Sequence, residues 1–76
     1  MRTRLEITQA RLEVLREDCR IVETRLFALA IEAIDPGLTE AELIERQTLQ
    51  QMHAQLVHET IDAFAELYYL SEGVRP

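Results

Sequence analysis

A chain of 76 residues is long enough for one small domain, whose hydrophobic core is thin at this size. The composition, 47% hydrophobic and 29% charged, predicts a folded chain, and the single cysteine excludes an internal disulfide. The net charge of −6, with Arg as the only basic residue type besides His, argues against a nucleic-acid partner.

The chain shows no sign of export or of a membrane span. It starts Met-Arg-Thr-Arg without an apolar segment behind it, so we expect no signal peptide. The longest strongly apolar run, 26–31, is far too short to cross a bilayer. We therefore expect a cytoplasmic protein. Because neither a disulfide nor a metal site can supplement the core, we expect association with another chain to supply the stability that the core lacks.

A first helix is predicted over about 4–34. Thr3-Arg4-Leu5-Glu6 matches a capping box at its start. A heptad pattern then holds for about four repeats, which indicates coiled-coil-like packing. The two seam columns are Leu5, Leu12, Cys19, Leu26, Ala33 and Thr8, Leu15, Val22, Leu29.

A second apolar column runs along the same helix. Ile7, Val14, Ile21 and Ala28 also recur every seven residues, about 100° beyond the second seam column. The column Arg4, Arg11, Asp18, Arg25 lies between them. Near the end of the helix, 26–31 is apolar nearly all round. One partner helix cannot cover all of these side chains.

A turn is predicted at 35–38, because Pro36 disfavours helix at Asp35 and Gly37 tolerates positive φ. A second helix follows over about 40–71. Thr39 and Glu42 match a capping box at its start, and Gly73 fits a left-handed C-terminal cap. A short connection makes long helices antiparallel neighbours. The expected fold is therefore all-α: one helical-hairpin domain over 1–76, completing a four-helix bundle with another chain.

The second helix also has a wide apolar face. Its columns are Leu49, Leu56, Ala63, Leu70 and His53, Thr60, Leu67, extended by Val57, Ile61, Phe64 and Tyr68. Folding near residue 36 should bring Leu12 level with Ile61, Leu5 level with Tyr68, Arg11 level with Asp62 and Cys19 close to His53. Residues 35–76 carry eight acids against two Arg, so the Arg column of the first helix should face acids of the second.

The surplus apolar surface predicts a site for another protein. A fully buried Val, Leu, Ile or Phe side chain contributes about 1.5–3 kcal/mol relative to an exposed one, so leaving several in water would forfeit much of the stability of a small domain. We expect these side chains to contact the helix of a partner chain. The predicted interface residues are Ile7, Val14, Ile21, Phe27, Ala28, Ile31, Ile34, Val57, Phe64 and Tyr68.

Catalysis and metal binding are weakly indicated. Cys19 stands in a seam column and should be a buried, inert side chain, and a Cys19–His53 pair would lack an oxyanion hole. The run 58–62 resembles the zincin helix motif with Asp62 in place of the second His, but His58 falls on the polar face. We predict no enzyme, no catalytic residue, no metal, no cofactor and no small-molecule substrate.

Two families share this layout. Thr3-Arg4-Leu5-Glu6, the Asp35-Pro36 break and Glu66-Leu67-Tyr68-Tyr69 resemble the small two-helix chaperone subunits of bacterial type III secretion needle proteins. The chain lacks the aromatic-Gln pair that those subunits often carry after the loop. This resemblance implies a chaperone-like role, with a helical-repeat chaperone and the needle protein as partners.

The hairpin length and the run 62–68 are also similar to plasmid copy-number regulators, which dimerise as four-helix bundles and bind paired RNA loops. Acids are interleaved with the Arg side chains that RNA binding would need. We therefore expect a chaperone-like or adaptor-like interaction protein. The alternative is a self-sufficient homodimeric four-helix-bundle regulator, phage- or plasmid-borne.

Overall fold

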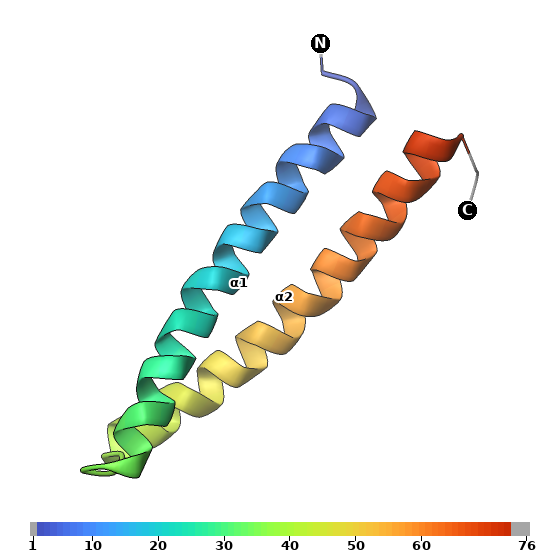
Figure 1. The fold of residues 1–76 in the computed structure, drawn as a ribbon. Helices are drawn as coiled ribbons and strands as arrows, with labels where there is room; N and C mark the ends of the chain where they lie inside the picture. The colour runs from blue at the N-terminus through green and yellow to red at the C-terminus, as the bar shows by residue number, and fades with distance from the viewer. Residues whose placement is uncertain (1, 74–76) are drawn as a thin grey trace.

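The computed structural model describes residues 2–73, and over this range the chain forms two helices and no strand (Figure 1). Helix α1 spans Arg4–Ile34 and helix α2 spans Glu40–Glu72. They pack against each other as an antiparallel hairpin, with both termini at one end and the turn at the other. The predicted all-α hairpin is confirmed.

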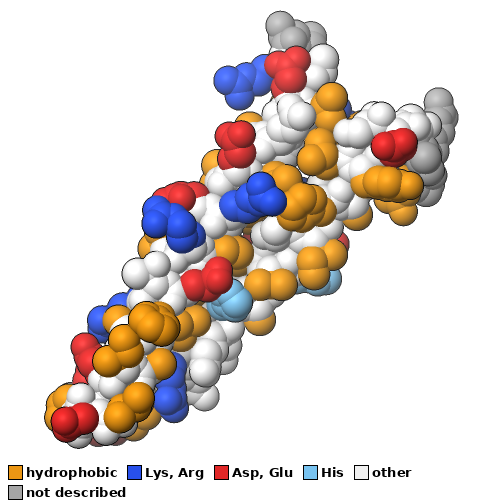
Figure 2. Space-filling model, viewed as in Figure 1, with side chains coloured by type: hydrophobic (Ala, Val, Ile, Leu, Met, Phe, Trp, Pro, Cys, Tyr) orange, Lys and Arg blue, Asp and Glu red, His pale blue; other side chains and the backbone are white. Residues whose placement is uncertain are grey.

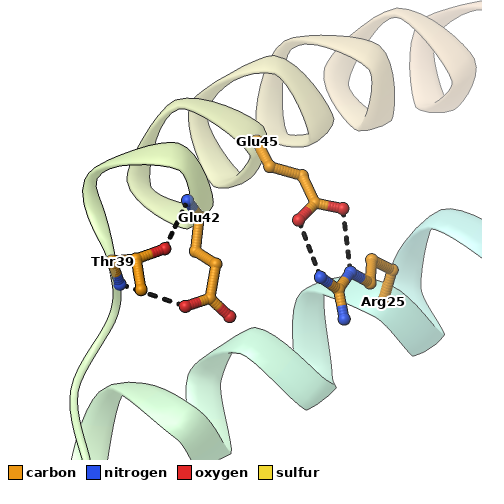
Figure 3. A network of polar contacts seen from close by, with 4 residues as sticks. All are labelled: Arg25, Thr39, Glu42 and Glu45. Atoms are coloured by element: carbon orange, nitrogen blue, oxygen red, sulfur yellow. Dashed lines mark hydrogen bonds and ion pairs between the residues drawn. The ribbon is translucent and has the colours of Figure 1, made fainter.

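Side-chain caps define where both helices begin. The Thr39 hydroxyl accepts a hydrogen bond from the Glu42 N–H at 3.2 Å, and the Glu42 carboxylate accepts one from the Thr39 N–H at 3.0 Å (Figure 3). The predicted capping box at α2 is therefore complete. At α1, Thr3 accepts from the Glu6 N–H, but the Glu6 carboxylate is bonded to the Thr3 hydroxyl and not to its N–H. Only half of the predicted box forms there.

Two glycines with positive φ end the helices. Gly37, at φ 101°, lies in the turn, and its N–H donates to the Glu32 carbonyl at 2.7 Å. Gly73, at φ 70°, is the left-handed C-cap of α2, as predicted. Both backbone conformations favour glycine because a Cβ atom is strained there.

The buried core is small. Within residues 2–73, the seam column Thr8, Leu15, Val22, Leu29 is buried along its whole length. In the other column Leu12 is buried, Leu5, Cys19 and Leu26 are half-buried, and Ala33 is exposed. The prediction of Ala33 in the seam was wrong, because it lies in the last turn of α1, where the chain leaves the helix pair. From α2, Ala63 is buried, with Leu56 and Leu67 packed beside it.

The register between the helices differs from the predicted one. The Cys19 Sγ lies 3.9 Å from the Thr60 Oγ1, and His53 faces Glu23, which is one turn beyond Cys19. Leu12 packs in one cluster with Ala63, two residues beyond the predicted Ile61, which is itself exposed. The chain reverses between Ile34 and Glu40, around Gly37 and not residue 36. Thr60 follows His53 by seven residues, so the residue of α2 that faces Cys19 lies about two turns beyond the predicted one.

The molecule is long and thin. Its extents are 53 × 23 × 16 Å and its radius of gyration is 16.7 Å, compared with about 11 Å for a compact domain of this length. Neither helix in the described range has a stretch apolar enough to cross a bilayer. A two-helix rod of this shape has one seam, so most side chains of each helix face outward.

Candidate interaction surface

A row of apolar side chains lies exposed along α1. We call Ile7, Val14 and Ile21 the α1 stripe; they are 55%, 60% and 56% exposed. Ala28, which continues the row toward the turn, is half-buried. Seven-residue spacing returns the three side chains of the α1 stripe to nearly the same side of the helix, so they lie in one row along α1.

A second group lies where the hairpin turns. Figure 2 shows hydrophobic side chains gathered on the visible face near this end of the molecule. Ile34 is 86% exposed and Phe27 is 68% exposed, so neither is covered by the hairpin itself. We call this group the tip cluster; it comprises Phe27, Ile31, Ile34, Leu43 and Ile44.

A third group lies on α2. We call Val57, Ile61, Phe64 and Tyr68 the α2 stripe, all of which are exposed, with Ile61 and Tyr68 near 60%. The Tyr68 ring makes an edge contact with the half-buried Tyr69 at 5.7 Å between centroids. Of the ten predicted interface residues, nine are therefore exposed and Ala28 is half-buried.

Among residues 2–73, the large exposed apolar residues outside the predicted set are Leu43, Ile44, Met52 and Ile61. The sequence places Ile61 on the apolar face of the second helix beside Val57, Phe64 and Tyr68, but the predicted interface leaves it out. Leu43, in the first turn of α2, is 44% exposed. The signal that could have found Ile61 and Ile44 is the width of the apolar face of α2, which exceeds what one antiparallel helix can cover.

Two ion pairs join the helices along one side of the seam. Arg4 donates to Glu66 at 2.7 Å near the termini. Near the turn, Arg25 donates two hydrogen bonds to Glu45, at 2.8 and 2.7 Å (Figure 3). These hydrogen bonds lower the pKa of both carboxyls. The expectation that the Arg column faces acids of α2 holds at Arg4 and Arg25, whereas Asp62 lies nearest His58 of its own helix, at 3.6 Å.

Different contacts join the helices along the other side. The His53 Nε2 lies 3.8 Å from the Glu23 carboxylate. The guanidinium of Arg16 lies 5.0 Å from the centroid of the Phe64 ring, in cation–π geometry. Glu23 and Arg25 are two residues apart, so their side chains leave α1 about 200° from each other. The two sets of contacts therefore flank the seam on opposite sides.

The two stripes open toward these opposite sides. Ile21 and Arg25 are four residues apart, hence about 40° apart around α1, so the α1 stripe borders the Arg–Glu side. Phe64 itself contacts Arg16, so the α2 stripe borders the other side. A single helix docked against one side of the hairpin would leave the opposite stripe exposed.

A shallow groove crosses the seam on the Arg–Glu side. It joins Ile21 of the α1 stripe to Met52 of α2, with Val22 and Leu56 at its floor. Its lining residues are Asp18, Ile21, Val22, Gln51, Met52, Gln55 and Leu56. The groove therefore extends the apolar surface of the α1 stripe onto α2.

Three carboxylates crowd the turn. Glu42 lies against Glu32, and this contact raises the pKa of Glu32 while lowering that of Glu42. The neighbouring charge of Glu45 adds to the rise at Glu32, and that of Arg25 opposes it. The pair lies across the two helices and is a source of repulsion at neutral pH.

The residues weighed for chemistry do not come together. Cys19 is half-buried against Thr60, two turns along α2 from His53. His58 and Asp62 are exposed neighbours on α2. Within residues 2–73, no three His, Cys, Asp or Glu side chains gather in a way that could hold a metal ion.

Comparison of the chain with protein-family models, with curated proteins and with solved structures finds no match.

Proposed function

We propose that the hairpin is a non-enzymatic interaction module, of the chaperone or adaptor type, that binds an amphipathic helix of another protein. The observation that carries this proposal is the exposure of the α1 stripe, the tip cluster and the α2 stripe. Twelve large apolar side chains are exposed in these three groups, and exposed apolar patches are typical of binding sites.

The energetics support the same conclusion. Within residues 2–73 five apolar side chains are buried, whereas thirteen large ones are exposed. Burying one exposed Ile, Val or Phe against a partner helix contributes up to about 1.5–3 kcal/mol, so a few such contacts rival the stability of a small domain. A partner helix in contact with the hairpin contributes to a bundle of three or four helices, which has the single internal core that two helices lack.

The α2 stripe is the part of this surface best suited to a foreign helix. It combines β-branched and aromatic side chains at i, i+4, i+7 and i+11, the spacing with which helices meet in grooves. Aromatic side chains are enriched at the centres of interfaces. The resemblance to needle-protein co-chaperones suggests one form of this role, in which the partner is a helical subunit held apart from its own polymer.

The test is binding of a purified partner helix to two matched variants. The partner is first co-purified with the chain and then titrated back by calorimetry. Ile61→Glu with Tyr68→Glu should weaken binding by about a hundredfold. Thr48→Glu with Gln55→Glu adds the same charge at the same spacing on another side of α2, and should leave the affinity within a few-fold.

The heat capacity change gives a second readout. Burial of apolar surface makes it negative, so a clearly negative value is expected for the parent chain. Equal affinity of both double variants, or a heat capacity change near zero, would exclude the α2 stripe as the binding surface.

A further inference from the structure

We propose that the α1 stripe is covered by the α1 stripe of a second copy of this chain, packed antiparallel about a two-fold axis at Val14. The hairpin would thus form a symmetric dimer through α1 and leave α2 to the partner of the proposed function. This inference rests on the proposed function only in assigning the α2 stripe to a different protein.

The distribution of charge selects α1 for self-association. Residues 1–34 hold six acids and six Arg, so two copies of this segment meet without net repulsion. Helix α2 holds seven acids against Arg46 alone. Packing α2 on another α2 would bring together like charges, which destabilise an interface.

The positions along the stripe fit a two-fold axis at Val14. Ile7 and Ile21 are each seven residues from Val14. In the antiparallel dimer, Ile7 of each copy therefore packs on Ile21 of the other copy. Their exposures, all between 55% and 60%, show that the hairpin leaves all three equally free.

The same register pairs opposite charges. Arg11 and Asp18 lie on the side of the stripe that faces the seam, three residues before and four residues after Val14. Antiparallel packing therefore brings Arg11 of one copy opposite Asp18 of the other, twice by symmetry. Both are exposed, and neither lies in an ion pair among residues 2–73. Arg4 would face Arg25 of the second copy. Each of these Arg side chains is already paired within its own chain, Arg4 with Glu66 and Arg25 with Glu45.

The surface area is large enough for such an interface. The chain exposes 5907 Å², against about 4,800 Å² for a compact monomer of its mass. The surplus is comparable with the roughly 800 Å² per partner of a standard protein–protein interface. The dimer would hold four helices, and its two α2 stripes would lie on the far sides of the two seams.

The first test is the mass of the purified chain by sedimentation equilibrium. A dimer is expected at micromolar concentrations. Val14→Glu with Ile21→Glu should give a monomer that stays helical by circular dichroism, because these positions are exposed in the hairpin. Ile61→Glu with Tyr68→Glu is the matched control and should leave the dimer intact. A monomeric parent chain, a dimer that persists in the α1 variant, or a dimer lost in the α2 control would each overturn the proposal.

A charge reversal tests the register. Arg11→Glu and Asp18→Arg each place like charges opposite each other in the dimer, so each should weaken self-association by about tenfold. Mixing the two variants should restore association, because both pairs between positions 11 and 18 across the mixed interface are then opposite in sign. Failure of the mixture to associate more tightly than either variant alone would exclude the antiparallel register at Val14.

The two proposals can fail separately. A chain that binds its partner helix but remains monomeric would refute the dimer and leave the proposed function standing. A chain that dimerises through α1 while its α2 stripe binds nothing would refute the proposed function and leave the dimer standing.

Discussion

Thr39 and Thr3 begin the two helices with the same residue type but with different hydrogen bonds. At Thr39 the hydroxyl and the Glu42 carboxylate each satisfy a backbone N–H that the helix leaves free. At Thr3 the Glu6 carboxylate is bonded to the hydroxyl, so one N–H fewer is satisfied by a side chain. The sequence motif is identical in type, and the difference lies in side-chain rotamers that no motif encodes.

Thr39→Ala should lower the free energy of unfolding by about 1 kcal/mol, because it removes the acceptor for the Glu42 N–H. Chemical denaturation followed by circular dichroism measures the change. Thr39→Ser keeps the hydroxyl and should behave like the parent chain, and Thr3→Ala should cost less than Thr39→Ala. An unchanged midpoint for Thr39→Ala would show that the box does not stabilise α2.

Cys19 is less buried than its seam position predicts. It is half-buried, with its Sγ 3.9 Å from the Thr60 hydroxyl. A thiol reagent should label it more slowly in the native chain than in the denatured chain, because the helix pair limits access. Cys19→Ala should leave the binding properties intact. Equal labelling rates in native and denatured protein would show that the seam is open at this level.

At the scale of the elements, ion pairs hold α1 and α2 together at both ends. The pKa of Glu45 and of Glu66 is lowered by hydrogen bonds from Arg25 and Arg4. A carboxyl whose pKa is lower in the folded chain stabilises the fold above its unfolded pKa, and this contribution is lost as the pH falls through the folded pKa. Glu32, with a raised pKa, has the opposite sign: its contribution is lost as the pH rises.

Stability should therefore decline as the pH falls below about 4, the usual range of a carboxyl pKa. Urea denaturation across pH 3–7 measures this decline. Glu45→Gln with Glu66→Gln should flatten it, because the Arg25–Glu45 and Arg4–Glu66 ion pairs are then absent at every pH. Glu32→Gln should instead raise stability at neutral pH, since it removes the repulsion with Glu42. A decline as steep in the double variant as in the parent chain would contradict these assignments.

For the whole molecule, the sequence predicted the number, bounds and order of the helices, because periodicity, caps and the Pro36-Gly37 break are local signals. It misjudged which residue of α2 faces Cys19 by about two turns, since Thr60 and not His53 lies there. Which residues of α1 and α2 lie opposite each other depends on the number of residues in the turn, and the turn sequence does not predict that number. The exposed rows at Val14 and Phe64 were anticipated, because a helix with apolar residues on two sides cannot hide both against one neighbour.

The division between core and surface can be tested by charge. Leu15 is 7% exposed and packs with Leu12 and Ala63, so Leu15→Glu should unfold the chain by burying an unpaired carboxylate. Val14→Glu, one residue away on an exposed side, should preserve helicity. Circular dichroism of the two variants at equal concentration makes the comparison. Unfolding of both would mean that Val14 belongs to the same core as Leu15.

On the proposed function, the hairpin is incomplete until its exposed apolar stripes are buried against another chain. The most direct test is the Tm of the isolated chain over about a hundredfold range of protein concentration, followed by circular dichroism. Association that buries these side chains stabilises the folded form by mass action, so Tm should rise with concentration. In the Val14→Glu, Ile21→Glu variant, Tm should be lower and independent of concentration. A sharp transition at one temperature across the whole range, equal in the parent chain and the variant, would show that the two helices suffice by themselves.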